Sequence, residues 1–118
     1  MADDRRALGE AGEHAAATFL TARGWTVLAR NVRRREGEVD IVARLDGTVA
    51  FVEVKTRRTR AYGTPGEAVT VRKQRRIRML ASSLLTEGIG HGRTIRFDVI
   101  EVHSRGGELT LRHIPDAF

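Results

Sequence analysis

The chain has 118 residues, no cysteine and a formal net charge of +6, and these values limit what it can be. This length suits a single domain, residues 1–118, with one hydrophobic core, and the lack of cysteine excludes disulfides, thiol catalysis and cysteine-based zinc sites. The N-terminal residues contain no apolar run typical of signal peptides or membrane spans. We therefore expect a cytoplasmic protein with no membrane partner.

Hydrophobic periodicity predicts seven elements in the order α-β-β-β-α-β-β. Their limits follow from apolar spacing, from the capping residues Thr70, Gly24 and Gly88, and from glycine-containing turns. In chain order the elements are a helix at 4–23, strands at 25–30, 37–45 and 48–55, a helix at 70–87, and strands at 94–103 and 109–114.

The first predicted helix has an apolar stripe that marks its core-facing side. Glu13 stands at the margin of this stripe. A glutamate in that place is ordinarily exposed, but it could also reach an active site. The stripe consists of Leu8, Ala11, Ala15, Phe19 and Ala22, and it is widened by Gly12, Ala16 and Leu20.

The dipeptide Asp46-Gly47 is a strong signal for a two-residue hairpin loop, in which both central residues need a positive φ. With that loop, Leu45 pairs with Thr48, and the residue numbers of every cross-strand pair add up to 93. The register of the two strands is therefore predicted along their whole length.

Four charged side chains fall on one face near the open end of this hairpin. The register places Asp40 opposite Glu53 and Glu38 opposite Lys55, and side chains alternate between faces with period two. The opposite face is purely apolar, and we expect it to face the core: Val39, Ile41, Ala43, Ala50, Val52 and Val54.

Two directly opposed carboxylates, Asp40 and Glu53, would have Cβ atoms about 5 Å apart and would repel each other unless a cation lay between them. Hard oxygen ligands suit Mg²⁺ or Mn²⁺, so the pattern predicts a metal site of the kind used on phosphodiesters. The alternative is a surface ladder in which Glu38 pairs with Lys55 and the two carboxylates are merely tolerated. The opposition of like charges argues against a ladder.

Positive charge is concentrated in residues 54–78, which hold nine Lys or Arg residues and one acid. Such clustering predicts an anionic partner, most often nucleic acid, although an arginine-rich solvated surface is the alternative. Tyr62, in a glycine-containing loop, could stack on a base. The candidate nucleic-acid contacts are Arg33, Arg34, Arg35, Arg57, Arg58, Arg60, Tyr62, Arg72, Lys73 and Arg76.

The ordered motifs resemble the PD-(D/E)xK nuclease signature, and over nearly the whole chain they resemble the YraN family of predicted endonuclease-like proteins. The resemblance implies a restriction-endonuclease-like mixed β-sheet of about five strands flanked by helices, similar to archaeal Holliday-junction resolvases. Val39 stands where the signature's proline would be. The matching motifs are Gly9-x-x-x-Glu13, Asn31, Gly37-Glu38-x-Asp40, Phe51-Val52-Glu53-Val54-Lys55-x-Arg57, Tyr62-Gly63, Lys73, Arg96-Phe97-Asp98-Val99 and Asp116-Ala117-Phe118.

By this resemblance, Asp40 and Glu53 would hold Mg²⁺ or Mn²⁺, and Glu13 would complete the metal site indirectly. Lys55 would orient or activate the attacking water, or would stabilise charge developing on the phosphate. Glu38 is typical of the family and joins the candidate catalytic residues without a defined role. The implied activity is metal-dependent hydrolysis of DNA, with branched or structured DNA as a candidate substrate.

Two other functions remain open from the sequence. The basic residues would bind phosphate without any chemistry in a non-catalytic nucleic-acid-binding module, or would meet RNA in a ribosome-associated factor. Resolvases of similar fold act as two-fold dimers, so a homodimer is also possible. Asp98 suits an arginine salt bridge at least as well as catalysis, and the four histidines have no metal-ligand spacing: His14, His91, His103 and His113.

Overall fold

The computed structural model describes residues 2–58 and 69–118, with side chains from residue 5 onward, and it confirms the predicted mixed α/β fold. The element order is the expected α-β-β-β-α-β-β. The bounds are α1 (Ala2–Ala22), β1 (Thr26–Arg34), β2 (Gly37–Leu45), β3 (Thr48–Arg57), α2 (Val71–Thr86), β4 (Thr94–Arg105) and β5 (Glu108–Ile114).

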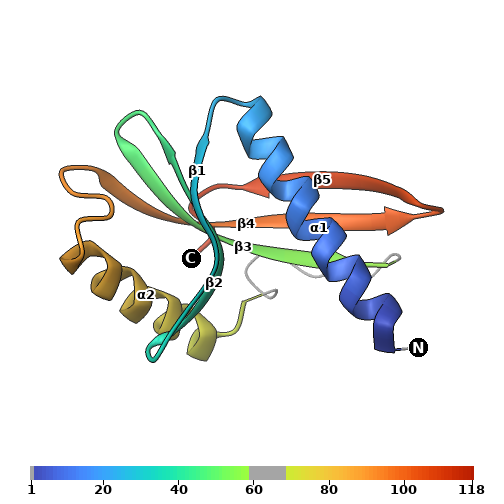
Figure 1. Cartoon of the computed structure of the whole chain (residues 1–118), viewed down its shortest axis with the longest axis horizontal. Helices are drawn as coiled ribbons and strands as arrows, with labels where there is room; N and C mark the ends of the chain where they lie inside the picture. The colour runs from blue at the N-terminus through green and yellow to red at the C-terminus, as the bar shows by residue number, and fades with distance from the viewer. Residues whose placement is uncertain (1, 59–68) are drawn as a thin grey trace.

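The five strands form one mixed sheet in which spatial order follows chain order, β1-β2-β3-β4-β5. Only β3 and β4 run parallel, and α2 lies in the connection between them; the other neighbours are antiparallel. Helix α1 crosses one face of the sheet and α2 covers the other (Figure 1). Each face therefore has its own hydrophobic core, and residues that alternate along a central strand enter the two cores in turn.

The two cores divide the central strands as period-two alternation requires. Beneath α1, Leu20 and Trp25 pack on Ile41 and Val52, and beneath α2, Leu80 packs with Phe51 and Val99, among other buried residues. Trp25 is buried and belongs to the core beneath α1.

Helix α1 approaches the sheet through a narrower face than its apolar stripe suggested. Gly12, Ala16 and Leu20 are buried, whereas Ala11 and Ala22, which were predicted in the centre of the stripe, are exposed. A Cβ on Gly12 would lie 2.0 Å from Thr56 Oγ1. The helix is therefore rotated toward its smallest residue, and that contact holds the next residue, Glu13, close to the sheet.

Helix α2 begins at the predicted N-cap, Thr70, whose hydroxyl oxygen accepts a hydrogen bond of 3.1 Å from the backbone N–H of Lys73. Its buried face is Ile77, Leu80, Ala81 and Leu84. Val71, in the first turn of the helix, is 61% exposed and lies outside this face.

The hairpin loop at Asp46-Gly47 is confirmed, and the register follows the predicted pairing from Leu45–Thr48 to Ile41–Val52. Asp46 has a positive φ of 49°. Gly47 does not have one, so the expectation of a positive φ at both central positions was wrong.

The ladder between β2 and β3 ends at Ile41–Val52, so Asp40–Glu53 and Glu38–Lys55 are not ladder pairs as predicted. Beyond this point β2 remains paired with β1, from Val32–Val39 to Arg34–Gly37, and β3 remains paired with β4. Asn31, whose position in β1 is opposite Asp40, has a left-handed φ of 51°, a conformation that asparagine tolerates better than most residues. We call the opening between β2 and β3 the fork.

The irregularity at the fork also moves Val39 to the other core. Val39 was predicted on the same face as Ile41, but it packs beneath α2 while Ile41 packs beneath α1. Two residues that are two apart in one strand can face opposite sides only where the regular alternation is broken. The break falls at Asp40, between them.

Candidate active site

Asp40 lies at the fork and is held there by the backbone of β3. Its Oδ2 accepts a hydrogen bond of 2.8 Å from the backbone N–H of Val54. That N–H points toward β2 but has no carbonyl partner beyond the end of the ladder. The strand separation therefore fixes the Asp40 carboxylate at the edge of β3, beside Glu53.

Glu53 extends from β3 toward α2 and is one of three buried charged or polar residues in the described chain, with 5% of its surface exposed. Lys73 Nζ on α2 lies 2.7 Å from Glu53 Oε1. The other oxygen, Oε2, is buried and has no hydrogen-bond donor. A buried carboxylate oxygen without a donor is costly in free energy.

Glu13 approaches Asp40 from the α1 side of the sheet. Its side chain is half-buried and lies within hydrogen-bonding reach of the Asp40 carboxylate. Asp40 therefore belongs to two overlapping acidic pairs, Glu13–Asp40 and Asp40–Glu53. We call the three residues the carboxylate cluster. The three acids lie near one another, and their roles as metal ligands stay a prediction.

The cluster perturbs the protonation of its own members. Burial and, after it, the adjacent Asp40 raise the pKa of Glu53, Lys73 offsets only part of the increase, and the resulting pKa is about 8. Burial and Asp40 also raise the pKa of Glu13. Burial disfavours the charge of Lys73, but the hydrogen bond to Glu53 and the charges of Glu53, Asp40 and Glu38 together outweigh burial and raise the pKa of this ammonium. A shared proton or a cation would relieve the repulsion.

The side chains fit a divalent cation through their chemistry, but they are not arranged as a complete ligand set. Over residues 2–58 and 69–118, no three His, Cys, Asp or Glu side chains are placed to hold a metal ion together. Asp40 and Glu53 offer hard oxygen atoms, one of them without a partner. Mg²⁺ commonly uses one or two carboxylates and keeps several waters, so this pair is a sufficient protein contribution.

Lys55 and Glu38 do not form the predicted pair. Lys55 is exposed on β3, two residues beyond Glu53 and on the same side of the strand. Glu38 is instead bound to Arg33, its neighbour across β1 and β2, with Nε 3.1 Å from Oε2. The lysine that contacts the carboxylate cluster is Lys73. The sequence marked it as a nucleic-acid contact and as a family-like motif residue, without a role beside the acids.

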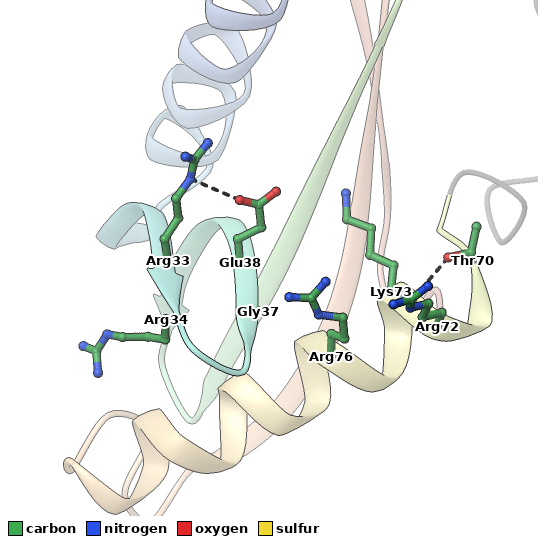
Figure 2. A pocket seen from close by; sticks show the side chains of 8 residues that line it. All are labelled: Arg33, Arg34, Gly37, Glu38, Thr70, Arg72, Lys73 and Arg76. Atoms are coloured by element: carbon green, nitrogen blue, oxygen red, sulfur yellow. Dashed lines mark hydrogen bonds and ion pairs between the residues drawn. The ribbon is translucent and has the colours of Figure 1, made fainter.

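A basic groove opens beside the cluster, between the β1–β2 turn and α2 (Figure 2). Its volume is about 700 Å³. A smaller pocket of about 140 Å³ contains Glu13 and Asp40, and it shares Arg33 and Glu38 with the basic groove. The groove is lined by Arg33, Arg34, Gly37, Glu38, Thr70, Arg72, Lys73 and Arg76.

The β1–β2 turn and α2 are in close contact at one wall of the groove. A Cβ on Gly37 would lie 3.1 Å from the backbone oxygen of Arg76, so the turn and the helix touch at a residue without a side chain. Arg34 forms two hydrogen bonds to Glu87, of 2.6 and 3.2 Å. Arg34 therefore ties the turn to the end of α2, and it is less available to a phosphate than Arg72, which is exposed.

The other predicted nucleic-acid contacts lie outside the groove or outside the described residues. Arg35 and Arg58 are exposed, and Arg57 is partly buried near the end of β3. Arg60 and Tyr62 lie outside the described residues. The structure thus brings together five of the ten candidates at one groove: Arg33, Arg34, Arg72, Lys73 and Arg76.

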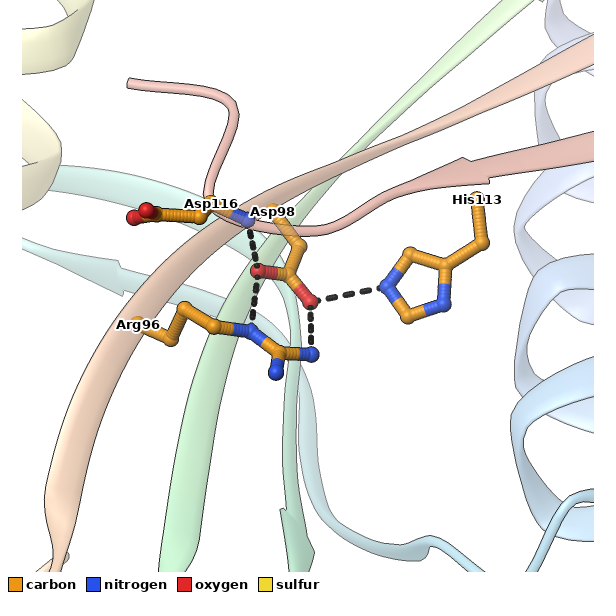
Figure 3. A network of polar contacts seen from close by, with 4 residues as sticks. All are labelled: Arg96, Asp98, His113 and Asp116. Atoms are coloured by element: carbon orange, nitrogen blue, oxygen red, sulfur yellow. Dashed lines mark hydrogen bonds and ion pairs between the residues drawn. The ribbon is translucent and has the colours of Figure 1, made fainter.

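Asp98 belongs to a separate network on the α1 side of the sheet (Figure 3). Arg96 donates two hydrogen bonds to its carboxylate, of 2.9 and 2.8 Å, His113 Nε2 lies 2.7 Å from Oδ2, and the backbone N–H of Asp116 donates at 2.9 Å. Burial would raise the pKa of Asp98, but these bonds outweigh burial and lower it. The expected arginine salt bridge is present, and it anchors the C-terminal segment.

Taken together, the fold and the site define a class: a small mixed α/β domain with a carboxylate cluster at a fork between two strands and a basic groove beside it. Residues 12–102 of the chain match the model of a protein family that is described as "Uncharacterised protein family UPF0102". The chain belongs to this family.

Relatives of the same family cover nearly the entire chain. A UPF0102 protein of Symbiobacterium thermophilum is 55% identical over 96% of this chain and 97% of its own length. A UPF0102 protein of Rhodococcus opacus is 49% identical over 95% of this chain and 96% of its own length. A solved structure, Pyrococcus furiosus SfsA in complex with Ca²⁺, aligns with a TM-score of 0.43 and 21% identity, over 93% of this chain and 63% of that chain. That similarity is too low to carry a functional argument.

Helices long and apolar enough to cross a membrane are absent from the described residues.

Proposed function

We propose that the protein is a divalent-metal-dependent endonuclease that hydrolyses DNA phosphodiester bonds at the fork. The observation that carries this proposal is the Glu53 carboxylate, which is buried beside Asp40 with Oε2 lacking a donor. A fold gains nothing in stability from such an arrangement. It is explained if the site is built to receive a cation.

Each side chain of the cluster has a role in this proposal. Asp40 and Glu53 would hold Mg²⁺ or Mn²⁺, and Glu13 would act through Asp40. When bound, such a cation supplies Lewis acidity toward a phosphate oxygen and increases the acidity of water. Lys55, exposed next to Glu53 on β3, would orient the attacking water or stabilise negative charge on the phosphate. The exposed arginines of the basic groove would hold the flanking phosphates.

The test is incubation of the purified protein with linear, flapped and branched DNAs in Mg²⁺ or Mn²⁺. We expect cleavage of at least one substrate, lost in EDTA, and reduced by about a hundredfold or more in Asp40→Asn and Glu53→Gln. Arg75→Met, an exposed change on α2, is the control and should retain cleavage. Cleavage that persists unchanged in both carboxylate variants would contradict the proposal.

A second candidate function is nucleic-acid binding without hydrolysis. It is favoured by the ion pair between Lys73 and Glu53, which partly neutralises the cluster without a metal, and by the basic groove itself. Binding would then survive EDTA and the carboxylate substitutions. Both functions predict affinity that falls steeply with salt through counterion release, and competition between DNA and RNA of the same length would distinguish a DNA partner from an RNA partner.

Oligomeric state and cellular location remain proposals. A homodimer would present two cleavage sites to a two-fold substrate. Light scattering at several protein concentrations measures the molar mass and so tests for the dimer directly. A cytoplasmic location follows from the proposed substrate and is tested by cell fractionation.

A further inference from the structure

We propose that the Lys73 ammonium is the resident counter-ion of the carboxylate cluster, and that a divalent cation replaces it on Glu53 and so frees Lys73 to bind a substrate phosphate in the basic groove. The inference rests on the proposed metal site and adds a residue that couples the two ligands. It assigns to Lys73 a function that changes with the occupancy of the cluster.

The first support is the position of the ammonium. Lys73 Nζ lies 2.7 Å from Glu53 Oε1, and the Lys73 side chain is 42% exposed whereas that of Glu53 is 6% exposed. Asp40 and Glu38 also attract the same ammonium. The ammonium therefore occupies the place beside the buried carboxylate where a cation is most strongly favoured.

The second support is that Lys73 does not complete the site. Glu53 Oε2 remains without a donor, and Asp40 binds the backbone of β3 rather than Lys73. One ammonium carries a single positive charge, whereas the cluster contains three carboxyl groups. A divalent cation matches this charge better, and two cations cannot share the same side of Glu53 without mutual repulsion.

The third support is that Lys73 has a second place to go. It lines the basic groove together with Arg72 and Arg76 (Figure 2). Its backbone N–H is held by the Thr70 hydroxyl, so the helix start stays fixed while the side chain turns. A lysine side chain has a flexible four-carbon stem and an ammonium with three donors, which suits an exchange between a carboxylate and a phosphate.

The exchange makes metal binding and phosphate binding cooperative. Without a metal, Lys73 is engaged with Glu53 and contributes little to the groove. With a metal, it adds a positive charge to the groove, so each ligand should increase the affinity for the other by the same factor.

The direct experiment uses the fact that the chain contains only two lysines, Lys55 and Lys73. Lysine labelled with ¹⁵N at Nζ gives two ammonium signals, and Lys73→Met assigns them. We expect Mg²⁺ to shift the Lys73 signal from that of an ion-paired ammonium to that of a solvated one. A Lys73 signal that keeps its ion-paired position when Mg²⁺ is saturating would overturn the inference.

Calorimetric titration with Mn²⁺ gives an independent reading. If Lys73 competes with the metal, Lys73→Met should bind Mn²⁺ more tightly than the unaltered protein, by about fivefold or more. Arg75→Met removes the same charge from an exposed position on the same helix and should change affinity by less than about twofold, because solvent screens it.

Calorimetry distinguishes a failure of the proposed exchange from a failure of the proposed metal site. Mn²⁺ binding that is equal or weaker in Lys73→Met overturns the exchange and leaves the proposed metal site intact. The absence of Mn²⁺ binding in both proteins overturns the metal site and the exchange together.

Discussion

Two buried acids on adjacent parallel strands have opposite surroundings. Asp98 on β4 is paired in register with Val52 on β3, one residue before Glu53, and the two acids therefore face opposite cores. Asp98 is fully buried and both its oxygens accept hydrogen bonds. Glu53 is 5% exposed and one of its oxygens has no donor.

The difference shows which acid supports the fold. The partners of Asp98 lower its pKa, and those of Glu53 fail to prevent an increase to about 8. A carboxylate that folding satisfies is structural, whereas one that folding leaves unsatisfied is maintained for another reason. This contrast supports the proposed site on the α2 side, at Glu53, and assigns Asp98 to stability.

The largest expected effect on stability is at Asp98. Asp98→Asn leaves Arg96 without its counter-charge and turns an amide group toward hydrogen-bond donors, so it should lower the free energy of unfolding by about 2–4 kcal/mol. Glu53→Gln has the same shape change but removes a charge that burial disfavours, so stability should stay within about 1 kcal/mol or rise. Urea unfolding of both variants in EDTA measures the contrast. A loss of unfolding free energy in Glu53→Gln as large as that in Asp98→Asn would contradict this contrast between the two acids.

The close approach of α1 to β3 gives a second, smaller effect. Gly12→Ala would bring a Cβ to 2.0 Å from Thr56 Oγ1, which forces the helix outward and should destabilise the protein by about 1–3 kcal/mol. The displacement should also move Glu13 away from Asp40 and so reduce cleavage.

Gly9→Ala is the matched control for that change. A Cβ at Gly9 meets nothing within 4 Å, so the substitution should be neutral or should stabilise the helix by up to about 1 kcal/mol. Equal effects of the two substitutions in thermal unfolding would show that α1 does not depend on this contact.

The pH dependence of stability has opposite signs for the two acids. The folded pKa of Asp98 lies below its ordinary value of 3.8, so its contribution is complete above that pH and is lost as pH falls through the folded pKa. The folded pKa of Glu53, about 8, exceeds its ordinary 4.5, so folding becomes less favourable as pH rises between these values. In metal-free buffer, the stability of Glu53→Gln relative to the unaltered protein should therefore increase across that window; a constant difference would contradict it.

Much of the fold could be predicted from the sequence because its signals are local. Apolar spacing, the Thr70 cap and the Asp46-Gly47 loop each act over a few residues, and the elements that they predicted are confirmed. The details that failed are the positive φ at Gly47 and the burial of Ala11 and Ala22. The register of the hairpin followed from the loop, and it held as far as Ile41 and Val52.

The fork could not be predicted because it depends on competition between strands. Val39 and Asp40 continue with β1 rather than β3, and this is accompanied by the left-handed backbone at Asn31. Asparagine tolerates a left-handed backbone, but its presence at position 31 is not enough to predict one.

The sequence marked Lys73 as a candidate functional residue but did not predict its contact with Glu53. Its contact with Glu53 spans a helix and a strand that are twenty residues apart in the chain. No local spacing expresses such a contact, and the sequence marked Lys73 only as a member of the basic cluster and of the family-like motifs. Lys55, next to Glu53 in the sequence, was the more visible lysine but lies exposed.

The most direct test of the account is a crystal structure of the protein grown with Mn²⁺, with the metal located by anomalous scattering. We predict a single strong peak at the fork, roughly 2.1 Å from oxygens of both Asp40 and Glu53, with Lys73 no longer in contact with Glu53. A peak elsewhere, with Glu53 still bound to Lys73 at saturating Mn²⁺, would contradict the central claim that this unsatisfied carboxylate is a metal ligand.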